Sequence, residues 1–162
     1  MMLRTVHVPA DRKNPYQRAL GLGLSRLGVR VKRLRLGWNV LGAAKGAAVL
    51  HIHWTSAVVN NPLWKVAVGF PFLAAQFLLM RLRGGRVVWT VHNLESHENG
   101  RPLQNRLGSA LIGAFANVVI VHGESARHAV SKRFGVPDRK IMPPVTASRC
   151  GTKRIAKRPA GG

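Results

Sequence analysis

Histidines end three separate apolar runs of this chain, and their side chains could do chemistry. The runs are Ala48-Val49-Leu50-His51-Ile52-His53, Val87-Val88-Trp89-Thr90-Val91-His92 and Val118-Val119-Ile120-Val121-His122. An imidazole can donate to a phosphate or sugar hydroxyl, act as a general base or bind a metal, because its pKa lies near neutrality. A histidine that only hydrogen-bonds a loop carbonyl is the structural alternative for each ring alone. The threefold recurrence favours a shared site.

The elements around these runs predict where the rings lie. We expect strands at residues 3–8, 29–34, 48–53, 86–92 and 118–122 and a sixth from 140, with helices at 15–27, 62–83, 102–116 and 124–134. Short β-branched runs between helical stretches are typical of parallel strands buried on both faces. The fold class predicted is α/β, a Rossmann-like parallel sheet flanked by helices. The strands then share one carboxyl edge, where such sheets bind ligands, so the histidines should meet there.

A metal site is a further hypothesis for these residues. His51 and His53 are two apart and project from one face of a strand, and Glu95, His97 and Glu98 complete a conceivable ligand set. Sugar-binding polar loops contain similar clusters, and no spacing here matches a standard zinc pattern. We therefore expect no metal and no other cofactor.

Charge and length limit the class of protein. The 162 residues fit one domain, and the net charge of +21 indicates an acidic partner such as nucleic acid, anionic lipid or a phosphorylated small molecule. The basic residues are scattered, with little of the aromatic interleaving that stacks bases, so we expect no nucleic acid. The single cysteine, Cys150, excludes an internal disulfide framework.

The two ends of the chain and one long apolar segment predict its location and its domain limits. Residues 1–8 lack an apolar signal-peptide core, which predicts a cytoplasmic protein. Residues 63–82 have the length of a membrane span but contain Lys65 and Pro71, so a buried or membrane-surface helix is expected. We predict a domain at 1–142 and a disordered basic tail at 143–162, the alternative being a functional tail that grips a polyanion.

One pattern resembles a known family. Val88-Trp89-Thr90-Val91-His92-Asn93-Leu94, followed by Ser96-His97-Glu98, is similar to the amino-terminal half of retaining glycosyltransferases of the two-domain GT-B type, family 4, the glycosyl transferases group 1 lineage. The resemblance covers about residues 3 to 142. It includes Asn14-Pro15-Tyr16-Gln17, His51-Ile52-His53-Trp54 and Val121-His122-Gly123-Glu124-Ser125-Ala126-Arg127.

The resemblance implies a nucleotide-sugar donor as cosubstrate, an acceptor bound mainly by this half, and polysaccharide or glycolipid assembly with retention of anomeric configuration. It implies that His92 is catalytic, orienting the donor sugar and stabilising the transition state. The other implied substrate-binding residues are His53, Trp54, Asn93, His97, Glu98, His122 and Glu124. Glu124 also has a structural interpretation, as an acidic residue in the first turn of a helix.

A basic, apolar amino-terminal half is typical of the members of this family that dock on membranes to reach lipid-linked acceptors, and the charge of this chain agrees with it. The resemblance therefore implies a peripheral location at the inner face of an anionic membrane. The implied interfacial surface is made of Trp64, Phe70, Phe72, Phe77, Arg81 and Arg83.

The sequence departs from the family after residue 142. Relatives continue through a Pro-His-Gly-like turn into a second Rossmann-like domain that carries most nucleotide contacts, whereas here Pro143-Pro144-Val145-Thr146 follows. Ser96 also stands where relatives often have proline. We expect a truncated or frameshifted product, inactive alone, or a second domain on a partner chain. The rival hypothesis is a non-catalytic basic module for anionic lipid or nucleic acid, whose binding would weaken steeply with salt.

Overall fold

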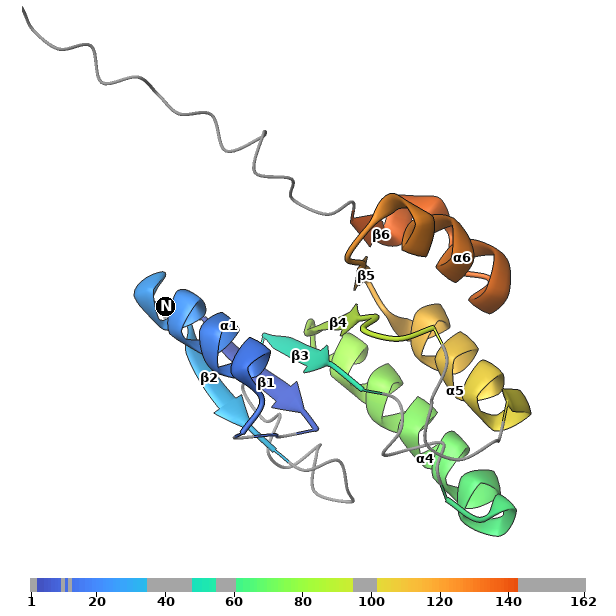
Figure 1. Ribbon diagram of the computed structural model, residues 1–162. Coiled ribbons are helices and arrows are strands. Elements are labelled where there is room, and N and C mark those ends of the chain that lie inside the picture. Colours follow the sequence, from blue (N-terminus) through green and yellow to red (C-terminus); the bar gives the residue numbers. More distant parts are fainter. Residues whose placement is uncertain are drawn as a thin grey trace, which may run out of the picture.

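The computed structural model describes residues 3–9, 11, 13–34, 48–54, 61–94 and 102–142. Within these ranges strands and helices alternate (Figure 1). Their bounds are β1 Arg4–Val8, α1 Pro15–Arg26, β2 Arg30–Arg33, β3 Val49–Ile52, α4 Leu63–Leu82, β4 Arg86–Thr90, α5 Pro102–Phe115, β5 Val118–Ile120, α6 Glu124–Phe134, the 3₁₀ turn η1 Asp138–Lys140 and β6 Ile141–Met142. The tail expected at 143–162 lies outside the described residues.

The six strands form one parallel sheet in the order β2-β1-β3-β4-β5-β6. This confirms the predicted fold class, a Rossmann-like α/β sheet flanked by helices. The chain runs outward from β1 to β2 and in the opposite direction from β3 to β6, so the order reverses between β1 and β3. Right-handed crossovers then place α1 on one face and α4, α5 and α6 on the other (Figure 1). Open α/β sheets bind ligands at such a reversal, outside the carboxyl ends of the strands.

The core lies between the sheet and its helices. Its strand residues include Val6, Leu50, Val87, Trp89 and Val119, all buried. Helix α5 approaches the sheet closely at Gly113, where a Cβ would lie 2.6 Å from Val136 Cγ2 and 3.5 Å from Trp89 Cζ3. A side chain here would overlap Val136, which follows α6, whereas the Trp89 ring of β4 lies at ordinary contact distance.

Local signals explain where the elements begin and end. Asn14 caps α1, its Oδ1 accepting from the Gln17 amide at 3.2 Å, and the helix stops before Gly28, whose φ of 75° suits glycine. These limits agree with the prediction. Strands β4 and β5 end two residues earlier than predicted, at Thr90 and Ile120, where their ladder pairing with each other ends. His92 and His122 thus lie in the loops beyond the sheet, not within strands.

Helix α4 is long and apolar enough to cross a membrane by length and composition, a test that core helices of soluble proteins also pass. One of its faces packs into the core through Val66, Leu73, Phe77 and Met80. The expectation that Phe77 belongs to an interfacial surface is therefore wrong, because Phe77 lies on this core face, near Phe115 of α5. Trp64, by contrast, is exposed.

Candidate functional site

Five histidines meet at the carboxyl edge of the sheet. They come from β1, β3 and the loops after β3, β4 and β5: His7, His51, His53, His92 and His122. Ring centroids are 4.2 Å apart between His51 and His53, 5.8 Å between His53 and His92, and 5.1 Å between His92 and His122. The prediction that the strand-end histidines converge on one edge is confirmed, because parallel pairing brings all these strand ends together.

The inner three rings lie beside the reversal point of the sheet. His7 of β1 is the register partner of His51 of β3, and His53 follows two residues later. His53 Nε2 lies 3.1 Å from His7 Nδ1, and His51 Nε2 lies 2.8 Å from the Thr90 hydroxyl of β4. The cluster is therefore tied together across three adjacent strands.

Burial sets the protonation of this inner cluster. It lowers the pKa of His7 to about 4, with the Arg33 charge acting in the same direction. It likewise lowers the pKa of His51 to about 3 and that of His53 to about 2, in both cases with smaller effects from neighbouring rings. All three imidazoles are neutral at pH 7. They can therefore accept as well as donate hydrogen bonds and can ligate metals.

His92 and His122 form an outer pair with two aromatic residues. His92 stacks on Trp54, with ring centroids 4.8 Å apart at an interplanar angle of 17°, and meets the edge of Tyr16 at 4.7 Å. His122 Nε2 lies 3.3 Å from His92 Nδ1. Burial first, and His122 second, lower the pKa of His92 to about 4, so this ring is also neutral at pH 7. The contacts hold the His92 ring in one orientation.

Several buried nitrogens of the site have no hydrogen-bond partner among the described residues. They are His7 Nε2, His53 Nδ1 and His92 Nε2. Leaving a buried polar atom unpaired costs about 1–3 kcal/mol, so such atoms in a cluster at a sheet edge indicate a place for a ligand.

Gln17 positions Tyr16 against the outer pair. The Gln17 side chain is fully buried; its Nε2 donates to the Pro9 carbonyl at 2.8 Å, and its Oε1 accepts from the Asp11 amide at 2.9 Å. These bonds tether the loop after β1 to the first turn of α1. Tyr16, next to Gln17, thus contacts His53, His92 and His122.

The remaining predicted site residues are either exposed or outside the described residues. Asn93 is exposed directly after His92. Glu124 is exposed in the first turn of α6, 3.9 Å from Arg127, an arrangement that fits its structural interpretation. His97 and Glu98 lie outside the described residues, as does Glu95 of the conceivable metal set.

Sequence reasoning did not include three members of this cluster: His7, Tyr16 and Thr90. His7 sits in Thr5-Val6-His7-Val8, another apolar run with a histidine near its end, so the same signal could have found it. Tyr16 belongs to the residues that carry the family resemblance, which assigns it no role. No signal in the sequence identifies Thr90, because only strand pairing brings it to His51.

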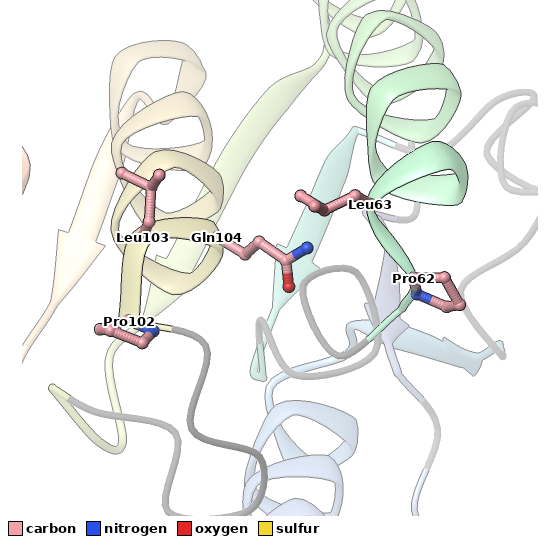
Figure 2. A pocket seen from close by; sticks show the side chains of 5 residues that line it. All are labelled: Pro62, Leu63, Pro102, Leu103 and Gln104. Atoms are coloured by element: carbon pink, nitrogen blue, oxygen red, sulfur yellow. The ribbon is translucent and has the colours of Figure 1, made fainter.

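A hollow lies between the amino-terminal ends of α4 and α5, the ends that follow β3 and β4 along the chain. Its volume is about 420 Å³, and its lining is almost wholly apolar: Pro62, Leu63, Pro102, Leu103 and Gln104. Figure 2 shows the Gln104 amide pointing from α5 into the space towards α4. Because these helix ends follow strands of the parallel sheet, the hollow lies on the same side of the molecule as the histidines.

Comparisons with known proteins support the fold. No protein-family model and no curated protein matches the chain at the level of sequence. HepE (Alr3699) of Anabaena, solved in complex with UDP, superposes with a TM-score of 0.54 at 13% identity, over 88% of this chain and 43% of HepE. A PfkB family carbohydrate kinase from Listeria grayi gives a TM-score of 0.43 at 13% identity, over 80% of this chain and 48% of the kinase, which is too low to indicate a common fold. The chain thus has the α/β fold of part of HepE and spans less than half of that protein's length.

Proposed function

We propose that this chain is the acceptor-binding, amino-terminal domain of a retaining glycosyltransferase of the GT-B type, family 4, which uses a nucleotide-sugar donor. The observation that carries the proposal is the convergence of His53, Trp54, His92 and His122 at one sheet edge. These are the residues to which the family resemblance assigns substrate contacts. The shared fold of HepE, solved with UDP, gives independent support.

His92 is the residue that acts on the donor sugar in this proposal. Its Nδ1 faces His122 and its ring lies against Trp54, which leaves Nε2 as the nitrogen for a substrate hydroxyl. A neutral imidazole held in this way can orient the sugar and stabilise charge that develops in the transition state. Trp54 and Tyr16 fix the ring and limit its contact with water.

Catalysis in this proposal needs a second domain. In a GT-B enzyme the donor lies in a cleft between two Rossmann-like domains, and the second domain supplies most contacts to the nucleotide. Half of such a cleft does not hold the donor in reacting geometry. We therefore expect no transfer by the 162-residue chain alone.

The test supplies a second domain. The chain is assayed for sugar transfer from a panel of UDP- and GDP-sugars, alone and fused through residue 142 to the second domain of a GT-B relative. We expect turnover only from the fusion, and His92→Ala in the fusion should lower kcat by about a hundredfold or more, the scale for losing a positioned acid, base or donor group. His128→Ala, at an exposed position of α6, is the matched control and should leave kcat unchanged.

Two results would contradict the proposal. Transfer by the isolated chain would show that no second domain is needed. An active fusion that is indifferent to His92→Ala, with circular dichroism showing an intact fold, would remove His92 from the site.

Membrane association belongs to the same proposal. Leu63 and Trp64, at the start of α4, are 72% and 67% exposed, and Lys65 Nζ lies 5.2 Å from the centre of the Trp64 ring. Exposed Leu103 and Leu107 of α5 extend the apolar surface beside the hollow. Apolar side chains in a chain of +21 charge suit the inner face of an anionic membrane, where a lipid-linked acceptor would be presented at the rim of the site.

Vesicle sedimentation tests this part. The chain should sediment with phosphatidylglycerol vesicles and much less with phosphatidylcholine vesicles. The double variant Leu63→Ser/Trp64→Ser should lose most of this binding, whereas Leu22→Ser/Leu27→Ser, at two exposed leucines near the carboxyl end of α1, should not. Equal losses in the two double variants would show that the start of α4 is not the contact. Binding that survives in both and disappears with salt would favour the rival, a purely electrostatic module.

A further inference from the structure

The inner histidine cluster has a geometry that the proposed glycosyl transfer does not require. His7, His51 and His53 are 0%, 6% and 1% exposed. Each offers one ring nitrogen, and these three nitrogens all lie within 4.8 Å of one another. These three rings are close together, shielded from solvent and without an acidic partner among the described residues. The proposed sugar transfer does not explain such a buried cluster.

The hydrogen bonds within the cluster leave some of its ring nitrogens without a partner among the described residues. The contact between His53 Nε2 and His7 Nδ1 uses one nitrogen of each ring. The other two, His7 Nε2 and His53 Nδ1, are buried and have no partner within the described ranges. Buried polar atoms are nearly always paired, so hydrogen bonds among the described residues do not account for this cluster.

We propose that His7, His51 and His53 bind a divalent transition-metal ion, with Zn²⁺ as the best fit. Imidazole nitrogen suits zinc, copper and nickel, and three histidines with an open fourth position form a known type of zinc site. Two nitrogens bound to one tetrahedral zinc are about 3.3 Å apart, given Zn–N bonds of about 2.0–2.1 Å. His53 Nε2 and His7 Nδ1 are 3.1 Å apart, close to that separation, so an ion bound by these two nitrogens would take the place of the hydrogen bond between them.

Thr90 supplies the outer support that such sites use. Its hydroxyl, 2.8 Å from His51 Nε2, fixes the orientation of the His51 ring from the neighbouring strand. Partners of this kind orient metal-bound histidines and raise metal affinity. The positive charge of Arg33 near His7 opposes cation binding, so the site depends on its three nitrogen ligands and not on the overall field.

This inference departs from the expectation that the chain binds no metal. The ligand set conceivable from the sequence joins His51 and His53 to Glu95, His97 and Glu98, and its spacing matches no standard zinc pattern. The third ligand comes instead from β1, 44 residues away from His51, and the pairing of His7 with His51 places it. The metal site shares His53 with the proposed substrate site, but the two are tested separately, because metal binding is measured without sugar transfer.

Metal binding by the full chain tests the proposal. The untagged protein, stripped with chelator, is titrated with Zn²⁺ by calorimetry and with Co²⁺ by visible absorption, with Mg²⁺ as the control cation. We expect one Zn²⁺ per chain, an intense cobalt band typical of tetrahedral coordination, and no response to Mg²⁺. If the native chain shows neither zinc binding nor the cobalt band, the proposal is wrong.

Variants then locate the ion. His53→Asn should lower the zinc affinity by more than about a hundredfold, and Thr90→Val by about tenfold to a hundredfold, the range for outer partners. His128→Ala, at an exposed histidine outside the cluster, should leave it unchanged. Zinc binding that is unaffected by His53→Asn, or lost in His128→Ala, would place the ion elsewhere and overturn the assignment. If His53→Asn does not fold, Thr90→Val decides, because it retains all three ligands and an unchanged affinity would contradict the site.

Discussion

Acidification should destabilise the metal-free chain well before its carboxylates titrate. His7, His51 and His53 have folded-state pKa values of about 4, 3 and 2, against an ordinary 6.5. Between pH 6.5 and the folded-state pKa of each ring, the histidine binds a proton in the unfolded chain but not in the folded chain. The stability is therefore complete above pH 6.5 and falls as the pH drops towards 4.

The size of the effect follows from the same values. One ring that stays neutral in the fold but has a pKa of 6.5 when unfolded contributes about 2 kcal/mol between pH 7.5 and pH 5. Three such rings contribute about 6 kcal/mol, which is comparable with the 5–15 kcal/mol that holds a whole domain together. His92 acts in the same direction.

Urea unfolding with EDTA present measures this loss. Tryptophan fluorescence is the signal, since the chain has four tryptophans, and the pH is varied from 7.5 to 5.0. Carboxylates interfere little, because the chain has only 5 Asp and Glu residues. His53→Leu should reduce the pH dependence by about a quarter to a third, because it removes one of the three inner rings and His92 adds a fourth contribution. His128→Ala is the control and should leave it unchanged.

The outcome that would refute this reasoning is specific. If the free energy of unfolding stays within about 1 kcal/mol from pH 7.5 to 5.0, the rings are solvated or charged in the fold and the cluster is not buried as described. If the free energy of unfolding rises on acidification, its pH dependence has the opposite sign, and the histidines are not neutral and buried in the fold.

Two further substitutions test the core and the loop that positions the site. Trp89→Ala should lower the free energy of unfolding by about 3–5 kcal/mol, because Trp89 is 2% exposed and its ring centroid lies 5.8 Å from that of Phe134. Urea unfolding at pH 7.5 measures this loss, and a loss under about 1 kcal/mol would contradict the buried packing of Trp89. Gln17→Ala removes the hydrogen bonds to the Pro9 carbonyl and the Asp11 amide, each worth about 0.5–1.5 kcal/mol, so we expect a loss of about 1–3 kcal/mol together with faster hydrogen exchange of the Asp11 amide. Unchanged exchange there would show that Gln17 does not tether the loop.

Much of this arrangement follows from the sequence alone. The apolar runs ending at His53, His92 and His122 predict buried parallel strands, and parallel strands have only one carboxyl edge at which such residues can meet. Helix limits at Asn14 and Gly28 follow from side-chain capping and from backbone conformations open to glycine. These are local or periodic effects, so the order of residues in the chain is sufficient to predict them.

Other features were decided by tertiary structure. Helix α4 is apolar nearly all round, so its composition does not say that Phe77 faces the core while Trp64 faces solvent; only packing on the sheet selects the buried face. In the same way, the pairing of β1 with β3 brings His7 beside His51, and the pairing of β3 with β4 brings Thr90 to the same ring. Strand order and register depend on contacts between residues distant along the chain. The sequence therefore determined that histidines would gather at one edge, and the sheet decided which of them form a closed, buried cluster.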